Sequence, residues 1–343
     1  MGIGSMSWDI LGQDLTVSAL RNSVQDGKLG HAYLIVGPPL SGRSTLAYLM
    51  AQAANCMEEE PPCGQCNQCQ RIQRGFHTDI QIVVPEINER TGRINTEITI
   101  DQIRELEKSA ILGAYEGTSR VFIIDGAELL SEEGANALLK TLEEPPPKVL
   151  FVLITSNENR VLPTILSRCQ RLEMSLLDTD TITHTLEVEQ SLGENDARLL
   201  AKLSGGRLGW ALKASKDPRI LEQRQQSLEE LLDLLKDGLE GRFQRSQDMA
   251  GIFARDRESV RAMLHLWLDW WRDLLMLKEK AGELVRNEDW LDSLLERESI
   301  YSSQDARYTV REILATIRAL EQNANARIAL DVLMIELPRQ HSY

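Results

Sequence analysis

The sequence has no long apolar segment, no targeting segment and no excess of basic residues. It contains no run of about 18 apolar residues, so we expect no membrane-spanning helix. Residues 1–6 are too short and too uncharged for a signal peptide, which favours the cytoplasm. The chain carries 38 basic and 52 acidic residues, a net charge of −14. Because nucleic-acid binding needs Lys and Arg to neutralise phosphates, a role at DNA would require protein partners or a local basic patch.

Cysteine is scarce as well, and its distribution indicates a metal site. Four of the five cysteines are close in sequence, at Cys56, Cys63, Cys66 and Cys69. Four thiolates in one short loop match the tetrahedral ligand set of structural zinc, and they leave no open position for a catalytic water. In a cytosolic protein this spacing favours a metal over disulfides, with unmetallated or redox-active thiols as the alternative. His77 follows the cluster and is expected to be an ordinary surface or loop residue.

A glycine-rich loop between a predicted strand and a predicted helix is the motif around which the chain is organised. The apolar residues 32–36 precede the loop Gly37-Pro-Pro-Leu-Ser-Gly-Arg-Ser-Thr45, and a helical pattern follows it. Backbone N–H groups of such a loop and of the first helical turn bind phosphate. Gly37 and Gly42 permit the tight turn, and Ser44 is placed to bind the Mg²⁺ of a nucleotide. A surface turn would not explain the strand and helix on either side.

One position of this loop departs from the usual pattern. Where a P-loop has Lys, this chain has Arg43. Arginine keeps the positive charge, but its planar guanidinium is bulkier and cannot place an ammonium between the β- and γ-phosphates. We therefore predict a P-loop fold whose nucleotide site is weakened, so binding of ATP or ADP with Mg²⁺ is left open.

A second apolar run, residues 120–125, ends in Asp125. A buried strand that ends in Asp presents its carboxylate to Mg²⁺ at the edge of a parallel sheet. Active ATPases normally follow this Asp with a Glu that orients the attacking water, whereas Gly126 follows here. Glu128 lies two residues further on, and we do not expect it to aim at that water. The candidate nucleotide-binding residues are Gly37, Gly42, Arg43, Ser44, Thr45 and Asp125.

The next segment continues the alternation of helix and strand. A helix is predicted over residues 131–145, where Ser131 can cap its N-terminus and prolines end it. Residues 149–154 are all apolar and predict a buried strand. The polar residues 155–157 after this strand could contact a γ-phosphate or form a turn, and the pattern favours neither.

Beyond residue 218 the pattern is helical throughout. Trp267, Trp270, Trp271 and Leu274 recur at the spacing of one helix face. Core packing is the preferred interpretation of these tryptophans, rather than a ligand-binding box.

In this order, the motifs resemble the AAA+ subunits of bacterial clamp loaders. The resemblance is carried by the loop 37–45, the cysteine cluster, Asn136-Ala-Leu-Leu-Lys-Thr-Leu-Glu-Glu-Pro-Pro146 and Ser167-Arg168-Cys169. The absence of Lys at position 43 and of Glu at position 126 looks like the stator subunit of these complexes rather than the gamma/tau motor. The resemblance covers residues 7 to about 215 and becomes a looser, all-helical likeness beyond them.

The resemblance implies a three-domain α/β and α architecture. We expect a RecA-like P-loop AAA+ domain over residues 1–173 with a zinc loop at about 56–69, a helical lid over 174–217, and an all-α collar over 218–343. It implies a pentameric ring with gamma/tau and delta subunits that places a sliding clamp on primed DNA. The chain would meet primer–template DNA only through that complex, and no membrane is involved.

The resemblance also implies a role for Arg168. In this family the Arg of Ser-Arg-Cys reaches the ATP of a neighbouring subunit as an arginine finger. A surface arginine paired with a carboxylate is the alternative. The motor subunits carry a sensor Arg on the lid, at whose position this chain has Leu208, with Arg207 one residue early.

Two other functions remain as hypotheses. The first is a gamma/tau-like motor that hydrolyses ATP with Arg43 and an unconventional base, against which Gly126 argues. The second is a zinc-stabilised, nucleotide-sensing adaptor outside replication. The combination of the 136–146 segment with Ser-Arg-Cys argues against that adaptor.

Overall fold

The computed structural model describes residues 8–88 and 93–339, and the chain divides into two compact units. The first unit is Met1–Asp178 with Gly206–Trp210, and the second is Thr179–Gly205 with Ala211–Tyr343. Within the described residues, no helix has the length and apolar character needed to cross a membrane.

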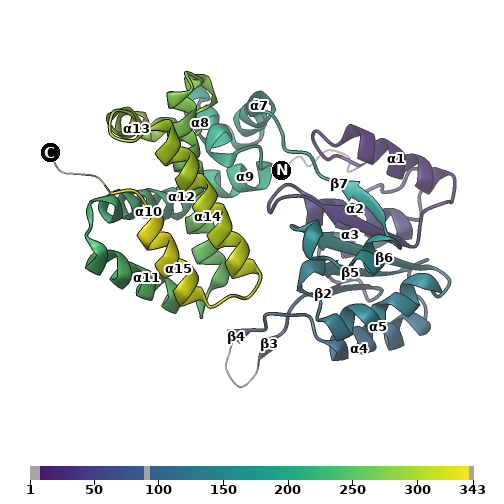
Figure 1. Ribbon diagram of the computed structural model, residues 1–343. Coiled ribbons are helices and arrows are strands. Elements are labelled where there is room, and N and C mark those ends of the chain that lie inside the picture. The colour runs from purple at the N-terminus through teal and green to yellow at the C-terminus, as the bar shows by residue number, and fades with distance from the viewer. Residues whose placement is uncertain (1–7, 89–92, 340–343) are drawn as a thin grey trace. The chain divides into compact units, whose positions relative to one another are not determined.

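A five-stranded parallel sheet forms the centre of the first unit (Figure 1). Its strands are β1 (Ala32–Val36), β2 (Ile80–Val83), β5 (Arg120–Asp125), β6 (Val149–Thr155) and β7 (Gln170–Glu173), in the spatial order β2-β5-β6-β1-β7. The predicted strands at 32–36, 120–125 and 149–154 are therefore confirmed, as is the parallel α/β class.

Helices cover both faces of this sheet. They are α1 (Asp14–Gln25), α2 (Arg43–Asn55), α3 (Asn67–Gln73), α4 (Ile100–Ile111), α5 (Glu132–Glu143) and α6 (Pro163–Leu166), and a short hairpin, β3 (Ile87–Asn88) and β4 (Arg93–Ile94), precedes α4. Alternate residues of β1 enter different cores: Tyr33 packs with α1 and α2, whereas Leu34 packs with α4 and α5. This two-sided burial explains why the strand reads as a continuous apolar run.

The N-termini of α4 and α5 are fixed by side-chain caps. Thr99 and Gln102 form a capping box at α4, and the Ser131 hydroxyl accepts a hydrogen bond from Gly134 N–H at α5. The predicted cap at Ser131 is confirmed, and α5 ends at Glu143, two residues before the first proline. The caps satisfy backbone donors that a helix start would otherwise leave unpaired.

The second unit is helical throughout its described residues. It contains α7 (Thr179–Gln190), α8 (Glu194–Ser204), most of α9 (Leu208–Lys216), α10 (Arg219–Lys236), α11 (Leu239–Phe253), α12 (Arg257–Lys278), α13 (Leu291–Glu298), α14 (Ser303–Glu321) and α15 (Ala326–Glu336). Trp267, Trp270 and Trp271 of α12 are all buried, which confirms the predicted core stripe. The ring centroids of Trp270 and Trp271 lie 5.2 Å apart in an edge-to-face arrangement, and those of Trp271 and Tyr301 lie 5.1 Å apart.

A fully buried arginine of α11 contacts the C-terminal ends of two other helices in this unit. Arg242 of α11 donates hydrogen bonds to the carbonyl oxygens of Leu337 at 2.6 Å, Pro338 at 2.9 Å and Met334 at 3.1 Å, and a longer one to Leu235. These carbonyls belong to the C-terminal ends of α10 and α15, where helix dipoles are negative. All its hydrogen-bond acceptors in the described part of the chain are thus peptide carbonyls, and burial lowers the pKa of Arg242.

Replacing Arg242 by Met should therefore lower the free energy of unfolding of the second unit by about 2–4 kcal/mol, because several buried carbonyls lose a charged donor. Urea unfolding followed by tryptophan fluorescence would measure it, since α12 carries three buried tryptophans. Arg255→Met is the matched control: Arg255 follows α11, is exposed, and its Nε donates to Gly251 O of that helix, so a change within about 0.5 kcal/mol is expected. Equal stability of the two variants would contradict the capping role.

Candidate functional site

The glycine-rich loop connects β1 to α2 at the carboxyl edge of the sheet. Gly37 N–H donates to Thr155 O of the neighbouring strand β6 at 3.2 Å. A Cβ on Gly37 would lie 2.8 Å from Met174 Cβ, so only glycine fits there. Gly42 caps α2 with φ +98°, a left-handed conformation that also favours glycine. The loop therefore delivers the N-terminus of α2, with exposed Ser44 and Thr45 in its first turn, to the sheet edge.

Ser44 and Asp125 come together although they lie far apart in the sequence. The Ser44 hydroxyl is 3.4 Å from Asp125 Oδ2, as expected for two groups that could share a Mg²⁺. Burial raises the pKa of Asp125, while Arg43 and the Ser44 hydrogen bond oppose the rise. Burial likewise lowers the pKa of Arg43, opposed by Asp125 and Glu128. Arg43 thus lies within the field of two carboxylates at this edge.

Glu128, which was not expected to aim at an attacking water, is held at this edge of the sheet by Ser156. Gly126 takes φ +100° and leads into a 3-10 helix, Ala127–Leu129, which turns the chain back toward the strand ends. Glu128 Oε1 accepts hydrogen bonds from Ser156 Oγ at 2.6 Å and from Ser156 N–H at 3.1 Å. The carboxylate is thereby fixed to the residue that follows β6. A glycine directly after the strand was the available signal for this turn.

The turn before α9 lies against the glycine-rich loop. Gly209 N–H donates to Leu40 O at 3.0 Å, and a Cβ on Gly209 would lie 2.8 Å from that oxygen. Leu40 itself has φ +63°, which is uncommon for a residue with a side chain. Leu208, at the position of the expected sensor Arg, begins α9. An apolar side chain therefore starts the helix where a nucleotide-sensing arginine was sought.

The four clustered cysteines form one group of potential metal ligands. The sulfur atoms of Cys56, Cys63, Cys66 and Cys69 all lie within 4.8 Å of one another. Backbone N–H groups point at the sulfurs: Cys66 N is 3.2 Å from Cys63 Sγ, and Cys69 N is 3.5 Å from Cys66 Sγ. Burial raises the pKa of the Cys66 thiol, but hydrogen bonds from Cys69 and Met57 outweigh it and bring the pKa to about 7. This donor set fits a thiolate-bound metal ion.

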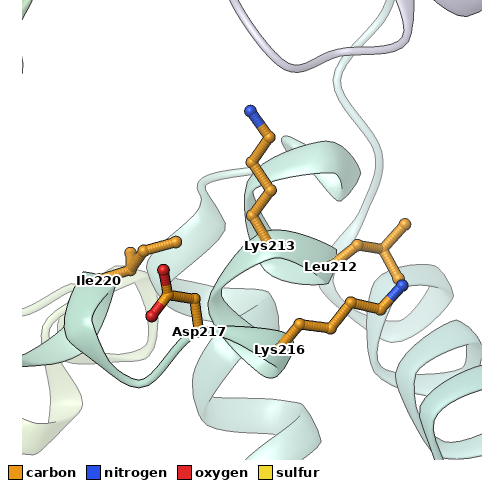
Figure 2. A pocket seen from close by; sticks show the side chains of 5 residues that line it. All are labelled: Leu212, Lys213, Lys216, Asp217 and Ile220. Carbon is orange, nitrogen blue, oxygen red and sulfur yellow. The ribbon is translucent and has the colours of Figure 1, made fainter.

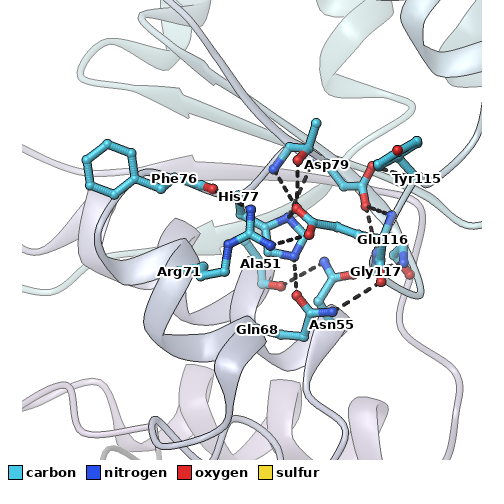
Figure 3. Close-up of polar contacts among 12 residues, drawn as sticks. Ala51, Asn55, Gln68, Arg71, Phe76, His77, Asp79, Tyr115, Glu116 and Gly117 are labelled. Atoms are coloured by element: carbon cyan, nitrogen blue, oxygen red, sulfur yellow. Dashed lines mark hydrogen bonds and ion pairs between the residues drawn. The ribbon is translucent and has the colours of Figure 1, made fainter.

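A network of polar contacts holds this cysteine loop on the first unit (Figure 3). Gln52 of α2 donates to Cys69 O at 2.8 Å, and Gln68 of α3 donates to Glu116 O at 3.1 Å. His77, expected as an ordinary surface or loop residue, lies in a loop but is buried, and its Nε2 is 2.6 Å from Gln68 Oε1. Its Nδ1 accepts a hydrogen bond from Asp79 N–H, so the neutral Nε2–H tautomer satisfies both ring nitrogens. Burial lowers the pKa of His77, in agreement with that form.

The centre of the network is the fully buried carboxylate of Asp79. It accepts backbone N–H bonds from Tyr115 at 2.6 Å, Gly117 at 2.7 Å and Glu116 at 2.9 Å. Burial raises the pKa of Asp79, but these three bonds outweigh it and the pKa is lowered. Hydrogen bonds from Thr78 and Arg71 lower the pKa of Glu116 to about 2. The loop at residues 115–117 and helix α3 are thereby joined to the start of β2.

Arg168 lies between α6 and β7, at the opposite end of the sheet from the glycine-rich loop. Strands β1 and β7 are parallel, with Tyr33 opposite Gln170 and Val36 opposite Glu173. Arg168 precedes the amino end of β7, whereas the loop follows the carboxyl end of β1. The two are therefore separated by the strand length, roughly 13 Å at about 3.3 Å per residue. Arg168 thus lies away from the candidate phosphate-binding loop of its own chain.

The Arg168 side chain is held by its surroundings. It forms an ion pair with Glu143, and its Nη1 donates to Thr164 O at 2.8 Å and Ser167 Oγ at 3.1 Å. It nevertheless remains 30% exposed. The adjacent Cys169 is packed against the core beside α5, and burial raises its pKa to about 12, so it is an unreactive thiol.

A pocket of about 340 Å³ lies in the second unit, where α9 ends and α10 begins (Figure 2). It is lined by Leu212, Lys213, Lys216, Asp217 and Ile220. The ammonium groups of the two lysines extend in different directions, and Asp217 is paired with Arg219. The pocket gathers no convergent polar groups and is not part of the candidate site.

Comparison with known proteins relates the chain to subunits of DNA polymerase III. A family model described as DNA polymerase III, delta subunit, matches residues 12–178. The DNA polymerase III subunit delta′ of Bacillus subtilis (strain 168) is 28% identical over 97% of this chain and 99% of its own length. The subunit tau of Escherichia coli (strain K12) is 35% identical over 52% of this chain, which spans only 27% of that relative. Among solved structures, a DNA polymerase III gamma subunit-related protein from Thermotoga maritima covers 94% of this chain and 99% of its own, at 20% identity and a TM-score of 0.49.

The likeness to delta′ extends over nearly the full length of both proteins, whereas the likeness to tau covers about half of this chain. The likeness to delta′ agrees with the resemblance indicated by the sequence. That resemblance included the glycine-rich loop, with Arg43 in place of Lys, and the Ser-Arg-Cys segment. The chain is thus similar to the delta′ subunit of DNA polymerase III over nearly its whole length, and to gamma/tau subunits over about half of it.

Proposed function

We propose that this chain is the stator of a clamp-loading complex, a subunit that supports ATP hydrolysis by its neighbour without hydrolysing ATP itself. Its ring would contain gamma/tau and delta subunits, five in all, and would place a sliding clamp on primed DNA. The first unit supplies the RecA-like AAA+ domain of residues 1–173, and residues 174–217 and 218–343 serve as the lid and the collar.

The position of Arg168 carries this proposal. It is a partly exposed, permanently charged group at the opposite end of the sheet from the chain's own glycine-rich loop. A guanidinium that contacts a γ-phosphate from a neighbouring subunit is an arginine finger, and such a group accelerates phosphoryl transfer by stabilising transition-state charge. Arg168 is therefore assigned the role of a finger supplied in trans.

The residues of the chain's own candidate nucleotide site also favour a subunit that does not hydrolyse ATP itself. Gly37, Gly42 and Thr45 would contact phosphate, and Ser44 and Asp125 would hold Mg²⁺ of a bound ATP or ADP. Arg43 replaces the phosphate-binding Lys, and Gly126 replaces the base that orients water. Glu128 is close to the site, but its Oε1 is committed to Ser156. The site is suited to retaining a nucleotide rather than to turning it over.

We further propose that Cys56, Cys63, Cys66 and Cys69 bind one structural Zn²⁺. Four thiolates complete a tetrahedral zinc site and leave no position for a reacting water. The ion would close the loop before α3, and the Asp79 network would join that loop to the rest of the first unit.

Arg168→Ala should abolish the contribution of the finger. Single-turnover ATP hydrolysis by the motor site that faces this chain is expected to fall by about 10³-fold or more in a reconstituted complex with primed DNA. Arg171→Ala is the matched control, because Arg171 is a nearby arginine paired with Glu158 and Glu173. An unchanged rate in the Arg168 variant would refute the stator assignment. Turnover by the isolated chain that Asp125→Ala removes would instead support the motor.

Cys66→Ser should remove the zinc. Purified wild-type chain is expected to contain one zinc ion by elemental analysis, and the variant close to none, because three thiolates without the fourth hold the ion weakly. Cys169→Ser is the control and should keep its zinc, since Cys169 lies outside the cluster. Retention of a full equivalent by the Cys66 variant would argue against this ligand set.

A further inference from the structure

The contacts of Arg168 suggest how the finger is held before it is used. Both terminal nitrogens of its guanidinium are engaged inside the chain, one with Glu143 and the other with Thr164 O and Ser167 Oγ. Its Nε is buried and has no hydrogen-bond acceptor among the described residues. The side chain therefore has one well-defined resting place in the isolated chain.

That resting place is electrically negative. Glu143 is the last residue of α5, so its carboxylate adds to the negative end of the helix dipole. The Thr164 carbonyl adds a further partial charge from α6. A guanidinium that reaches a phosphate outside the chain has to give up at least the bond to Glu143.

We propose that Glu143 is a positioning residue for Arg168: it holds the guanidinium at the end of α5 until a phosphate of the neighbouring subunit competes for it. This inference rests on the proposed function of Arg168 as a finger in trans. Glu143 touches no nucleotide in this scheme and acts only through Arg168.

The exposure of the pair sets the size of the effect. The side chains of Arg168 and Glu143 are 30% and 51% exposed. An ion pair this accessible to water shifts an equilibrium by only about two- to five-fold. A phosphate carries more charge and accepts bonds in pairs, so it can displace the carboxylate. Glu143 therefore restrains the Arg168 side chain, but weakly enough for a phosphate to displace it.

The test uses Glu143→Gln in the reconstituted complex with motor subunits and primed DNA. Loss of the competing charge should raise kcat/KM for ATP about two- to five-fold, and the difference should shrink at high salt. Glu144→Gln is the matched control: the same charge is removed one residue away, on an exposed side chain. In the Arg168→Ala background, Glu143→Gln should have no effect, because the residue acts only through the finger.

A second measurement needs only the isolated chain. Nitrogen-15 spectra of labelled arginine should show a restrained Arg168 guanidinium, identified by its loss in Arg168→Ala. Glu143→Gln should remove that restraint, whereas Glu144→Gln should preserve it.

The outcomes separate the two proposals. If Arg168→Ala leaves hydrolysis unchanged, the finger itself is refuted, and the role of Glu143 with it. If Arg168→Ala abolishes hydrolysis while Glu143→Gln leaves kcat/KM unchanged, the finger stands and the competition is refuted. A fall in kcat/KM for Glu143→Gln would also overturn the inference, since it would mean that the carboxylate is needed while the finger acts.

Discussion

The strands β1, β5 and β6 are buried on both faces, and this burial decides where chemistry can lie. An unpaired polar side chain within such a strand would face an apolar core, so polar groups occur where the strands end. The register places the end of β1 beside Thr155 and the end of β5 beside Ile154. The glycine-rich loop, the Asp125 carboxylate and the polar residues after β6 therefore share one edge of the sheet.

The same parallel order separates the two halves of the proposed mechanism. A strand and its parallel neighbour start at one edge and finish at the other, so a group before β7 and a loop after β1 face away from each other. Under the proposed mechanism, a single chain of this topology would have a nucleotide site without its own arginine finger, and a finger that serves another subunit. In the proposed ring, each interface would join the Arg168 edge of one subunit to the glycine-rich-loop edge of the next.

The sequence was most informative where the pattern is local. The apolar runs predicted the three central strands, Ser131 predicted a helix start, and the tryptophan spacing predicted the core of α12. It was least informative where distant segments meet. The burial of Arg242 depends on carbonyl groups far along the chain, at Met334 and Leu337, and no local pattern predicts it. His77 contacts Gln68 of the preceding helix α3, and the sequence did not predict that contact. The contact of Glu128 with Ser156 depends on one left-handed glycine that redirects the chain after β5, and the sequence alone did not predict that contact.

The buried Asp79 makes one loop of the first unit sensitive to acid. The pKa of Asp79 is lower in the folded protein than in an unfolded chain. Its contribution to the free energy of unfolding is therefore complete above about pH 4, and it declines as the pH falls toward the pKa of the folded state. Over that interval the Asp79 carboxyl binds a proton in the unfolded state but not in the folded state. The free energy of unfolding therefore falls by up to about 1.4 kcal/mol per pH unit. Arg242 accepts no proton at low pH, so the helix ends that it joins lack this weakness. Acid should therefore loosen the loop at residues 115–117, and with it the support of the cysteine loop, before it affects that junction in the second unit.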